Sequence, residues 1–197
     1  MRTILPHDAK LVPKQSGLVF KGVIHDVYHW QQKMYDGSYA TYEMIKRQDT
    51  VKVIAIVDDK IVVVEQTQPD SPNVFYDIPG GRHDHKDETE LEAAKRELVE
   101  ETGLTFSNWK LVDCFQPSDK IEQFVYTFIA NELISRSRQS LDNGEKISVH
   151  EMSYDEALSK CDLPNAKYMP KQLLVRAGSI DGLLNLKEYI GKAEPKQ

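Results

Sequence analysis

A capped and strongly acidic helix is the feature that most constrains how this chain folds. Thr89 and Glu92 fit a capping box, in which each side chain satisfies a free backbone donor at the start of a helix. Apolar residues then recur at helical spacing and mark the buried side: Leu91, Ala94 and Leu98. Gly103 supplies a left-handed stop. The sequence therefore predicts a helix over residues 89–102 that packs one face against a core.

Segments with the composition of β-strands lie on both sides of this helix. The upstream segments, rich in β-branched and aromatic residues, span residues 23–29, 39–47, 51–57, 61–65 and 74–78. The pair Asp36-Gly37 between the first two predicts a tight hairpin turn. Downstream, strands are predicted at residues 109–115, 124–131 and 147–152, and helices at residues 153–161, 167–177 and 183–190. This order predicts the α/β (α+β) class, a mixed β-sheet with helices packed against it and an N-terminal antiparallel hairpin.

The length and charge of the chain limit its organisation and its partners. Its 197 residues suffice for one domain with a proper core. We expect a polar arm at residues 1–16, a single domain at residues 17–191 and a short tail at residues 192–197. A net charge of −6 argues against nucleic acid as the partner, because a phosphate backbone needs a basic surface. An acidic chain can still bind a phosphate-rich substrate if divalent cations bridge the two.

Neither secretion nor a membrane span is predicted. The first ten residues lack the long apolar run of a secretory signal. No stretch reaches the ~18 apolar residues needed to cross a bilayer. The two cysteines, Cys114 and Cys161, form no CxxC pair and have no metal-binding spacing. Such thiols are typical of a reducing compartment, so we expect a cytoplasmic protein.

The predicted helix carries three carboxylates within one turn. Glu97 shares a face with Glu100 and Glu101, because positions three and four apart are neighbours on a helix. Their mutual repulsion costs stability unless a hard divalent cation binds between them. A solvated acidic surface is the alternative interpretation. Just upstream, Gly80 and Gly81 allow the backbone to approach a ligand closely, so that a carbonyl oxygen can join a metal shell.

Residues 96–104 carry a specific resemblance. They read Arg-Glu-Leu-Val-Glu-Glu-Thr-Gly-Leu and match without a gap the second half of the Nudix box, R-E-U-x-E-E-x-G-U with U apolar. Glu88 stands eight residues before Arg96, where the family has its first glutamate, so the box covers residues 81–104. The chain therefore resembles the Nudix hydrolases, and the resemblance implies their α/β/α sandwich with a mixed sheet.

The resemblance also implies a mechanism. Nudix enzymes bind one to three Mg²⁺ ions, for which Mn²⁺ can substitute, and the ligands that correspond here are Glu97, Glu100, Glu101 and the Gly81 carbonyl. The ions neutralise diphosphate oxygens and lower the pKa of a water that attacks phosphorus. Arg96 is then the partner that fixes a glutamate rotamer. Glu145 corresponds to the glutamate that can serve as catalytic base, with Asp142 as its nearest competitor.

One departure from the family pattern lies in the box. Six residues separate Gly81 from Glu88, whereas the family has five. The extra residue leaves open whether the carbonyl of Gly80 or of Gly81 faces the metal. The same loop contains His83 and His85, which we interpret as part of a solvated loop, because a fourth ligand with zinc-binding spacing is missing.

Within the family, residues 18–178 resemble the ADP-ribose pyrophosphatase branch. The branch usually has an arginine where Gln68 stands, and a glutamine carries no charge. We therefore expect Arg47, Arg82 or Lys120 to supply charge to the substrate, with Gln68 as a hydrogen-bonding contact. The implied substrate is a nucleoside diphosphate linked to another moiety, ADP-ribose or another nucleotide sugar. A homodimer is implied by the resemblance alone.

Two other functions fit the same sequence. A nucleoside triphosphate pyrophosphohydrolase of the housecleaning type would use the same box. A non-catalytic sensor of nucleotide sugars would keep the fold, but such proteins usually lose box glutamates that this chain retains. Three aromatic residues of the predicted N-terminal hairpin allow two interpretations: Tyr28, Trp30 and Tyr35. They either pack in a core or stack on an adenine ring, within one chain or across a dimer.

Overall fold

The apolar run predicted at residues 51–57 becomes the centre of a mixed β-sheet. The computed structural model describes residues 2–69, 71–85 and 87–193. The strands of the body and of the termini are β1 Ile4–Leu5, β5 Asp49–Val57, β6 Lys60–Gln68, β7 Ser71–Asp77, β8 Arg82–His83, β9 Leu104–Phe115, β11 Val125–Arg136, β12 Lys146–Met152 and β13 Lys192–Ala193. The strands of a separate sheet are β2 Gly17–Lys21, β3 Asp26–Lys33, β4 Tyr39–Lys46 and β10 Ile121–Glu122. The helices are α1 Glu90–Thr102, α2 Tyr154–Lys160, α3 Lys171–Ala177 and α4 Ile180–Leu184.

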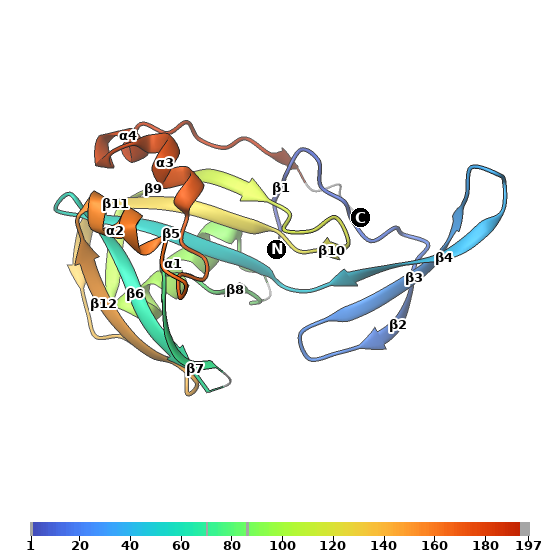
Figure 1. Ribbon diagram of the computed structural model, residues 1–197, viewed down its shortest axis with the longest axis horizontal. Helices are drawn as coiled ribbons and strands as arrows, with labels where there is room; N and C mark the ends of the chain where they lie inside the picture. The colour runs from blue at the N-terminus through green and yellow to red at the C-terminus, as the bar shows by residue number, and fades with distance from the viewer. Residues whose placement is uncertain (1, 70, 86, 194–197) are drawn as a thin grey trace.

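The body is a sheet between helices, and the second sheet projects from it as a lobe (Figure 1). The main sheet follows the order β12-β6-β5-β11-β9, with β7 paired to β6 and β8 paired to β5. Only β5 and β11 run parallel among these pairs, so the sheet is mixed. The lobe follows the order β10-β4-β3-β2 and contains the predicted hairpin of β3 and β4. We call this four-stranded sheet the N-lobe.

The side chains of β5 alternate between two cores. On one face, Val51, Val53 and Ala55 share a core with the apolar residues of α1, which are Ala93, Ala94 and Leu98. On the other face, Ile54 and Ile56 share a core with residues of the C-terminal helices, which are Ala157, Leu174 and Leu183. Because both faces of the strand are covered, its sequence is a continuous apolar run rather than an alternating one.

A gap in the main sheet positions the loop before α1. Strands β5 and β6 pair only beside their turn, at Ile56 with Ile61 and at Val57 with Lys60. Further along β5, the N–H of Val53 donates to Pro79 O at 2.8 Å, and the N–H of Val51 donates to Gly81 O at 2.9 Å. The Pro-Gly-Gly turn therefore lies against the central strand.

The N-terminal segment is fastened to the body through buried charges. Arg2 pairs with Asp49 at 2.7 Å and with Glu122 at 3.1 Å. The buried carboxylate of Glu90 accepts the Thr3 hydroxyl at 2.6 Å. Leu5 joins the core, and β1 pairs with β13. The segment predicted as a polar arm thus contacts the start of α1 and the base of the N-lobe.

Several segments differ from the sequence prediction in their bounds, among them the last helix and β7, and parts of two others lie outside the described residues. The strand predicted at residues 23–29 is Asp26–Lys33, and the helix predicted at residues 167–177 begins only at Lys171. Helix α4 ends at Leu184, so the helix predicted over residues 183–190 is wrong beyond that point. The Asn185 amide donates to Asp181 O at the end of α4, and the Tyr189 N–H donates to Leu111 O on β9. Strand β7 is longer than predicted, because it pairs with β6 from Ser71. Residue 1 of the predicted arm and residues 194–197 of the predicted tail lie outside the described residues.

No helix in the described part of the chain is both long and apolar enough to span a membrane.

The capping box of α1 gives a stability test. Thr89 Oγ1 accepts the Glu92 N–H at 3.3 Å, while the Glu92 carboxylate accepts the Thr89 N–H at 2.7 Å. Thr89→Ala should lower the free energy of unfolding by about 1 kcal/mol, because a backbone donor loses its partner. Thr89→Ser keeps the hydroxyl and should stay close to the wild type. Urea unfolding of the three proteins measures both effects, and equal losses for alanine and serine would contradict the capping account.

Candidate active site

Helix α1 presents its acidic side to the turn that precedes it. Its capping box fixes the first turn, and Gly103, at φ 73°, ends the helix in the left-handed conformation. A Cβ at Gly103 would lie 2.2 Å from Ser137 O, so only glycine fits there. Both ends of the helix are thereby set relative to β8 and to the segment after β11.

One guanidinium collects the carboxylates of this side. Arg96 Nε and Nη2 donate to the two oxygens of Glu88, at 2.9 and 3.2 Å. Its Nη1 donates to Glu97 at 2.8 Å and to Glu100 at 3.1 Å, and Nη2 also donates to Arg82 O at 2.9 Å. Arg96 therefore ties the loop before the helix to two of the three predicted ligands.

The glycine pair lies directly against the other carboxylates. The N–H of Gly80 donates to Glu101 Oε2 at 2.8 Å. A Cβ at Gly81 would lie 2.3–2.7 Å from the carboxylate atoms of Glu97. Gly80 has φ 147°, and a Cβ there would lie 2.1 Å from Val51 O. Gly80 requires glycine, because its neighbour is the fixed backbone of the central strand, whereas a side chain at Gly81 would displace the Glu97 carboxylate.

Burial leaves part of this negative charge uncompensated. Glu101 is only 4% exposed, and burial raises its pKa to about 8. The charge of Lys52 and the hydrogen bond from the Gly80 N–H oppose this rise, whereas the carboxylates of Glu97 and Glu145 add to it. Burial also raises the pKa of Glu97, Arg96 opposes this, and Glu100 and Glu145 add to it. A site that holds excess negative charge in this way favours a bound cation.

Glu145 lies in the loop between β11 and β12, and its charge acts on the same cluster. The carboxylate adds to the burial-driven rise in the pKa of both Glu97 and Glu101. The loop turns at Asp142, whose N–H donates to Glu145 Oε2 at 3.1 Å, and the N–H of Glu145 returns to Asp142 O at 2.9 Å. Of the two candidate bases, Glu145 is therefore the one that we place beside the predicted metal ligands.

The donor atoms fit a hard divalent cation. Glu97, Glu100 and Glu101 offer carboxylate oxygens, and Gly81 brings its backbone against Glu97, which is the chemistry that Mg²⁺ prefers. Among residues 2–69, 71–85 and 87–193, no three acidic, histidine or cysteine side chains already converge as a metal cage. Cation binding therefore requires Glu97 and Glu100 to exchange hydrogen bonds with Arg96 for contacts with the ion.

Lys52 is a site residue that the sequence analysis missed. It is 8% exposed on β5, and its Nζ pairs with Asp77 Oδ2 at 2.5 Å. The centroid of the Tyr168 ring lies 5.2 Å from the ammonium group. The charge of Lys52 opposes the rise that burial causes in the pKa of Glu101. A lysine inside the apolar run of residues 51–57 was the available signal, since a buried ammonium group needs a partner.

The residues predicted to contact substrate are spread over the site and the N-lobe. Arg82 begins β8, and the Nε of its exposed side chain lies 3.5 Å from Asp84 Oδ2. Gln68 ends β6, and Arg47 follows β4 with a buried Nε that has no hydrogen-bond partner among the described residues. None of the contacts described for these three residues reaches a carboxylate of α1.

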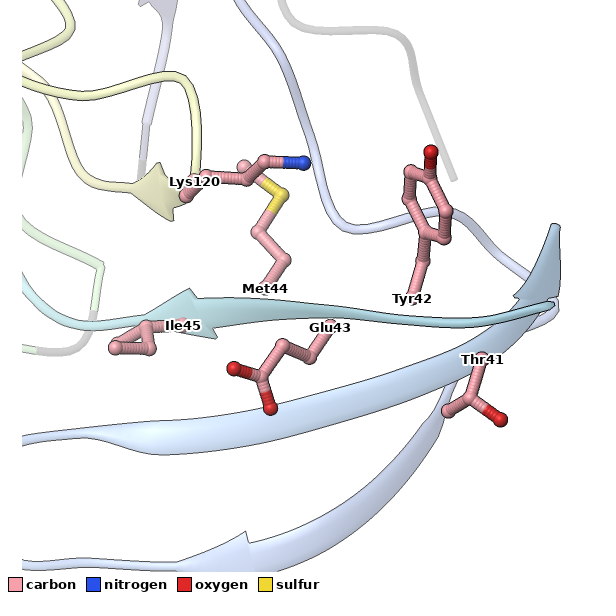
Figure 2. Close-up of a pocket in the computed structure, with 6 residues that line it drawn as sticks. All are labelled: Thr41, Tyr42, Glu43, Met44, Ile45 and Lys120. Atoms are coloured by element: carbon pink, nitrogen blue, oxygen red, sulfur yellow. The ribbon is translucent and has the colours of Figure 1, made fainter.

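Lys120 lies on the N-lobe, as Figure 2 shows. Its Nζ is 5.1 Å from the centroid of the Tyr42 ring. Tyr42 and Met44 point to the side of β4 on which Lys120 lies, whereas Glu43 points to the other side (Figure 2). These residues line a hollow of about 370 Å³ on the strand. Lys120 thus lines a hollow in which Tyr42 provides the aromatic ring.

His83, in the loop with the extra residue, is packed more closely than the sequence indicated. His83, interpreted as part of a solvated loop, is only 8% exposed, and its Nε2 donates to Glu88 O at 2.7 Å. Asp87 adopts φ 68°, the left-handed conformation, which accommodates the extra residue in a tight turn. Glu88 consequently still reaches Arg96, and α1 is unaffected.

Comparisons with known proteins agree with this geometry. The family model described as the NUDIX domain matches residues 46–173. An ADP-ribose pyrophosphatase of Bacillus subtilis (strain 168) is 29% identical over 154 residues, which cover 77% of this chain and 82% of that protein. A crystal structure described as an ADP compounds hydrolase has a TM-score of 0.68 at 18% identity, and the match covers 85% of this chain and 93% of that one. The predicted α/β fold with a mixed sheet is confirmed.

The buried Glu101 predicts how the metal-free protein responds to pH. An acid whose pKa rises from 4.5 to about 8 on folding stabilises the protein fully below pH 4.5, and this contribution is lost as the pH rises to about 8. Glu101→Gln stays neutral and can still accept the Gly80 N–H. In EDTA, the variant should therefore melt at a higher temperature than the wild type near pH 8.5, with the difference shrinking toward pH 5.5.

Thermal melting from pH 5.5 to 8.5 measures this difference. Glu92→Gln on the exposed side of α1 is the matched control, because glutamine still completes a capping box. The control should follow the wild type. Glu101→Gln curves that run parallel to the wild type at every pH would show that Glu101 carries no such charge.

Proposed function

The chain belongs to the Nudix family and is a Nudix hydrolase, and from this premise we propose that it hydrolyses the diphosphate bond of ADP-ribose or a related nucleoside diphosphate conjugate with magnesium. The observation that carries the proposal is the arrangement of Glu97, Glu100 and Glu101 around Arg96 and the Gly80-Gly81 turn. The relative from Bacillus subtilis, described as an ADP-ribose pyrophosphatase, supports this choice of substrate class.

The metal ligands that we propose are the carboxylates of Glu97, Glu100 and Glu101 and a carbonyl of the Gly80-Gly81 turn. The Gly81 carbonyl, the ligand expected from the resemblance, would have to bind the ion while it also accepts the Val51 N–H. When bound there, Mg²⁺ neutralises diphosphate oxygens and activates water, and Mn²⁺ can take its place. Arg96 is the proposed partner that keeps Glu97 and Glu100 in their orientation, because its planar guanidinium donates to both. A buried cluster that needs a cation is then completed only when metal and substrate arrive.

Glu145 is the proposed general base. It comes from a loop that holds none of the proposed carboxylate ligands, and its charge adds to the burial-driven rise in the pKa of Glu97 and Glu101. A carboxylate that approaches a metal cluster from the open side can take the proton of the attacking water while the ligands hold the diphosphate. Arg96, Glu97, Glu100, Glu101 and Glu145 together form the proposed catalytic set.

For the substrate, we propose contacts to Arg47, Gln68, Arg82 and Lys120. Arg82 has an exposed side chain, and its backbone carbonyl accepts from Arg96, so its guanidinium is available to the diphosphate. Arg47 has a buried donor without a partner among the described residues, which an anionic group would satisfy. Lys120 and Tyr42 line a hollow with one cationic and one aromatic wall, which suits the nucleoside end.

We propose a homodimer in which the N-lobes meet. Strand β2 is the outer strand of the N-lobe, so one backbone edge is available for pairing. It exposes a run of large apolar side chains: Leu18, Val19 and Phe20. Such a run is typical of an interface rather than of a free surface. We further propose that residues 17–191 act as one domain, with the N-lobe serving assembly and the body serving catalysis.

We also propose a cytoplasmic setting. Both cysteines are free, and Cys114 is buried. Free thiols of this kind are typical of a reducing compartment.

A substrate panel tests the activity. With Mg²⁺, the protein should convert ADP-ribose to AMP and ribose 5-phosphate, and Glu100→Gln should lower kcat by about 100-fold or more, as loss of electrostatic stabilisation commonly does. Glu92→Gln, on the same helix but away from the cluster, should keep the wild-type rate. Product identification by chromatography distinguishes the alternatives. Faster release of pyrophosphate from nucleoside triphosphates would favour a housecleaning enzyme, and tight binding of ADP-ribose without turnover would favour a sensor.

Sedimentation velocity tests the assembly. Phe20→Lys places a charge on β2 and should convert the dimer to a monomer at micromolar concentrations, because a desolvated charge opposes burial. Val175→Lys on α3 is the matched control, since both side chains are 60% exposed. The control should remain dimeric. A wild-type protein that sediments as a monomer would refute the proposed dimer directly.

A further inference from the structure

The segment that follows β11 caps the end of α1. The last carbonyl groups of a helix have no partner within it. Here the Ser140 N–H donates to Glu100 O at 2.9 Å, the Gln139 amide donates to Glu101 O at 2.5 Å, and the Ser137 N–H donates to Gly103 O at 2.8 Å. These contacts hold residues 137–140 against the helix turn that carries the proposed metal ligands.

Gln139 does more than cap the helix. Its Nε2 also donates to Ile147 O, on β12, at 3.2 Å. Both acceptors are carbonyl oxygens, so only the amide nitrogen, with its two hydrogens, can serve both. The side chain therefore bridges the last turn of α1 and a strand residue two positions beyond Glu145. This amide closes the base of the loop of residues 140–146, next to the ion pair between Arg136 on β11 and Glu151 on β12.

The closed loop is held against an electrostatic force. The Gln139 bridge brings the strand residue two positions after Glu145 to the turn of α1 that holds Glu101. The like charges of Glu145, Glu97 and Glu101 then repel one another. The turn from Asp142 to Glu145 shapes the tip of the loop, but its hydrogen bonds stay within the tip. On one side of the tip, β12 pairs with β6 from Lys146 onward. Gln139 adds the link between this strand and α1, which fixes the path of the loop relative to the helix that carries the cluster.

We propose that Gln139 is a positioning residue that holds Glu145 beside Glu97 and Glu101. The proposal rests on the proposed function, in which Glu145 is the general base. Gln139 touches neither the substrate nor the ligands' carboxylates, and it acts by fixing the path of the loop. Displacement of a reacting group by about 1 Å can cost up to about 100-fold in rate, so loss of the tether should lower kcat rather than substrate affinity.

The central variant is Gln139→Met, which keeps the length of the side chain and removes both hydrogen bonds. It should lower kcat for ADP-ribose about tenfold and leave KM within about twofold. Ser137→Ala is the matched control, because it removes a side-chain contact to Gly103 O, 3.2 Å long, at the same helix end without touching β12. If Gln139 were only a helix cap, the two variants would share a lower melting temperature and an unchanged kcat.

A double-mutant cycle with Glu145→Gln tests whether Gln139 affects kcat through Glu145. In the Glu145→Gln background, Gln139→Met should change kcat by less than about twofold, because the group that it positions is already inactive. Equal losses in both backgrounds, or no loss in either, would overturn the proposal.

Hydrogen exchange of the metal-free protein gives a readout that needs no turnover. Amides of residues 140–146 should exchange faster in Gln139→Met than in Ser137→Ala, and equal exchange would overturn the tether. If Glu145→Gln alone kept the wild-type kcat, the base assignment in the proposed function would fail. The exchange result would then still decide whether Gln139 holds the loop.

Discussion

The ion-pair network of Arg96 is the interaction on which the rest of the site depends. Without it, Glu88, Glu97 and Glu100 would repel one another, and the ion pair between Glu88 in the preceding loop and Arg96 on α1 would be lost. One guanidinium satisfies all three carboxylates, and it also donates to the Arg82 carbonyl. The pre-formed state is therefore a network of arginine and glutamates, which a divalent cation can enter by replacing individual hydrogen bonds.

The fold supplies the other half of this arrangement through backbone contact. A gap between β5 and β6 admits the Gly80-Gly81 turn, and its carbonyl groups accept hydrogen bonds from the central strand. The same turn presses on α1 so closely that side chains larger than glycine would collide with Val51 or Glu97. Sheet, turn and helix thus meet at a single point where the negative charge is concentrated. The N-lobe is attached near this region by Glu122, which pairs with Arg2 and Lys46.

Much of this arrangement could be predicted from the sequence, because it is encoded locally. The capping box and Gly103 define α1 without reference to distant residues, and the apolar run of residues 51–57 identifies a strand covered on both faces. The proposed ligands share one helix, so their proximity follows from helical spacing alone. Glu145 could be named only from the family resemblance, because its position relative to α1 depends on how a separate loop folds.

The features that escaped prediction depend on contacts between distant segments. Lys52 has meaning only through Asp77, and His83 only through the turn that ends at Glu88. Gln139 appears in the sequence as one polar loop residue among many, although it connects α1 to β12. The helix predicted beyond Leu184 failed for the same reason, because that segment instead donates from Tyr189 to β9. Local propensity is overridden where a tertiary partner takes the backbone hydrogen bond.

Anomalous scattering from manganese tests the central claim most directly. Crystals of the full chain grown with Mn²⁺ and a non-hydrolysable ADP-ribose analogue would show where the cation binds. The account predicts at least one anomalous peak at a bonding distance of about 2.2 Å from carboxylate oxygens of Glu97, Glu100 and Glu101, with Arg96 displaced from one of them. An ordered analogue accompanied by no anomalous peak at these residues would contradict it.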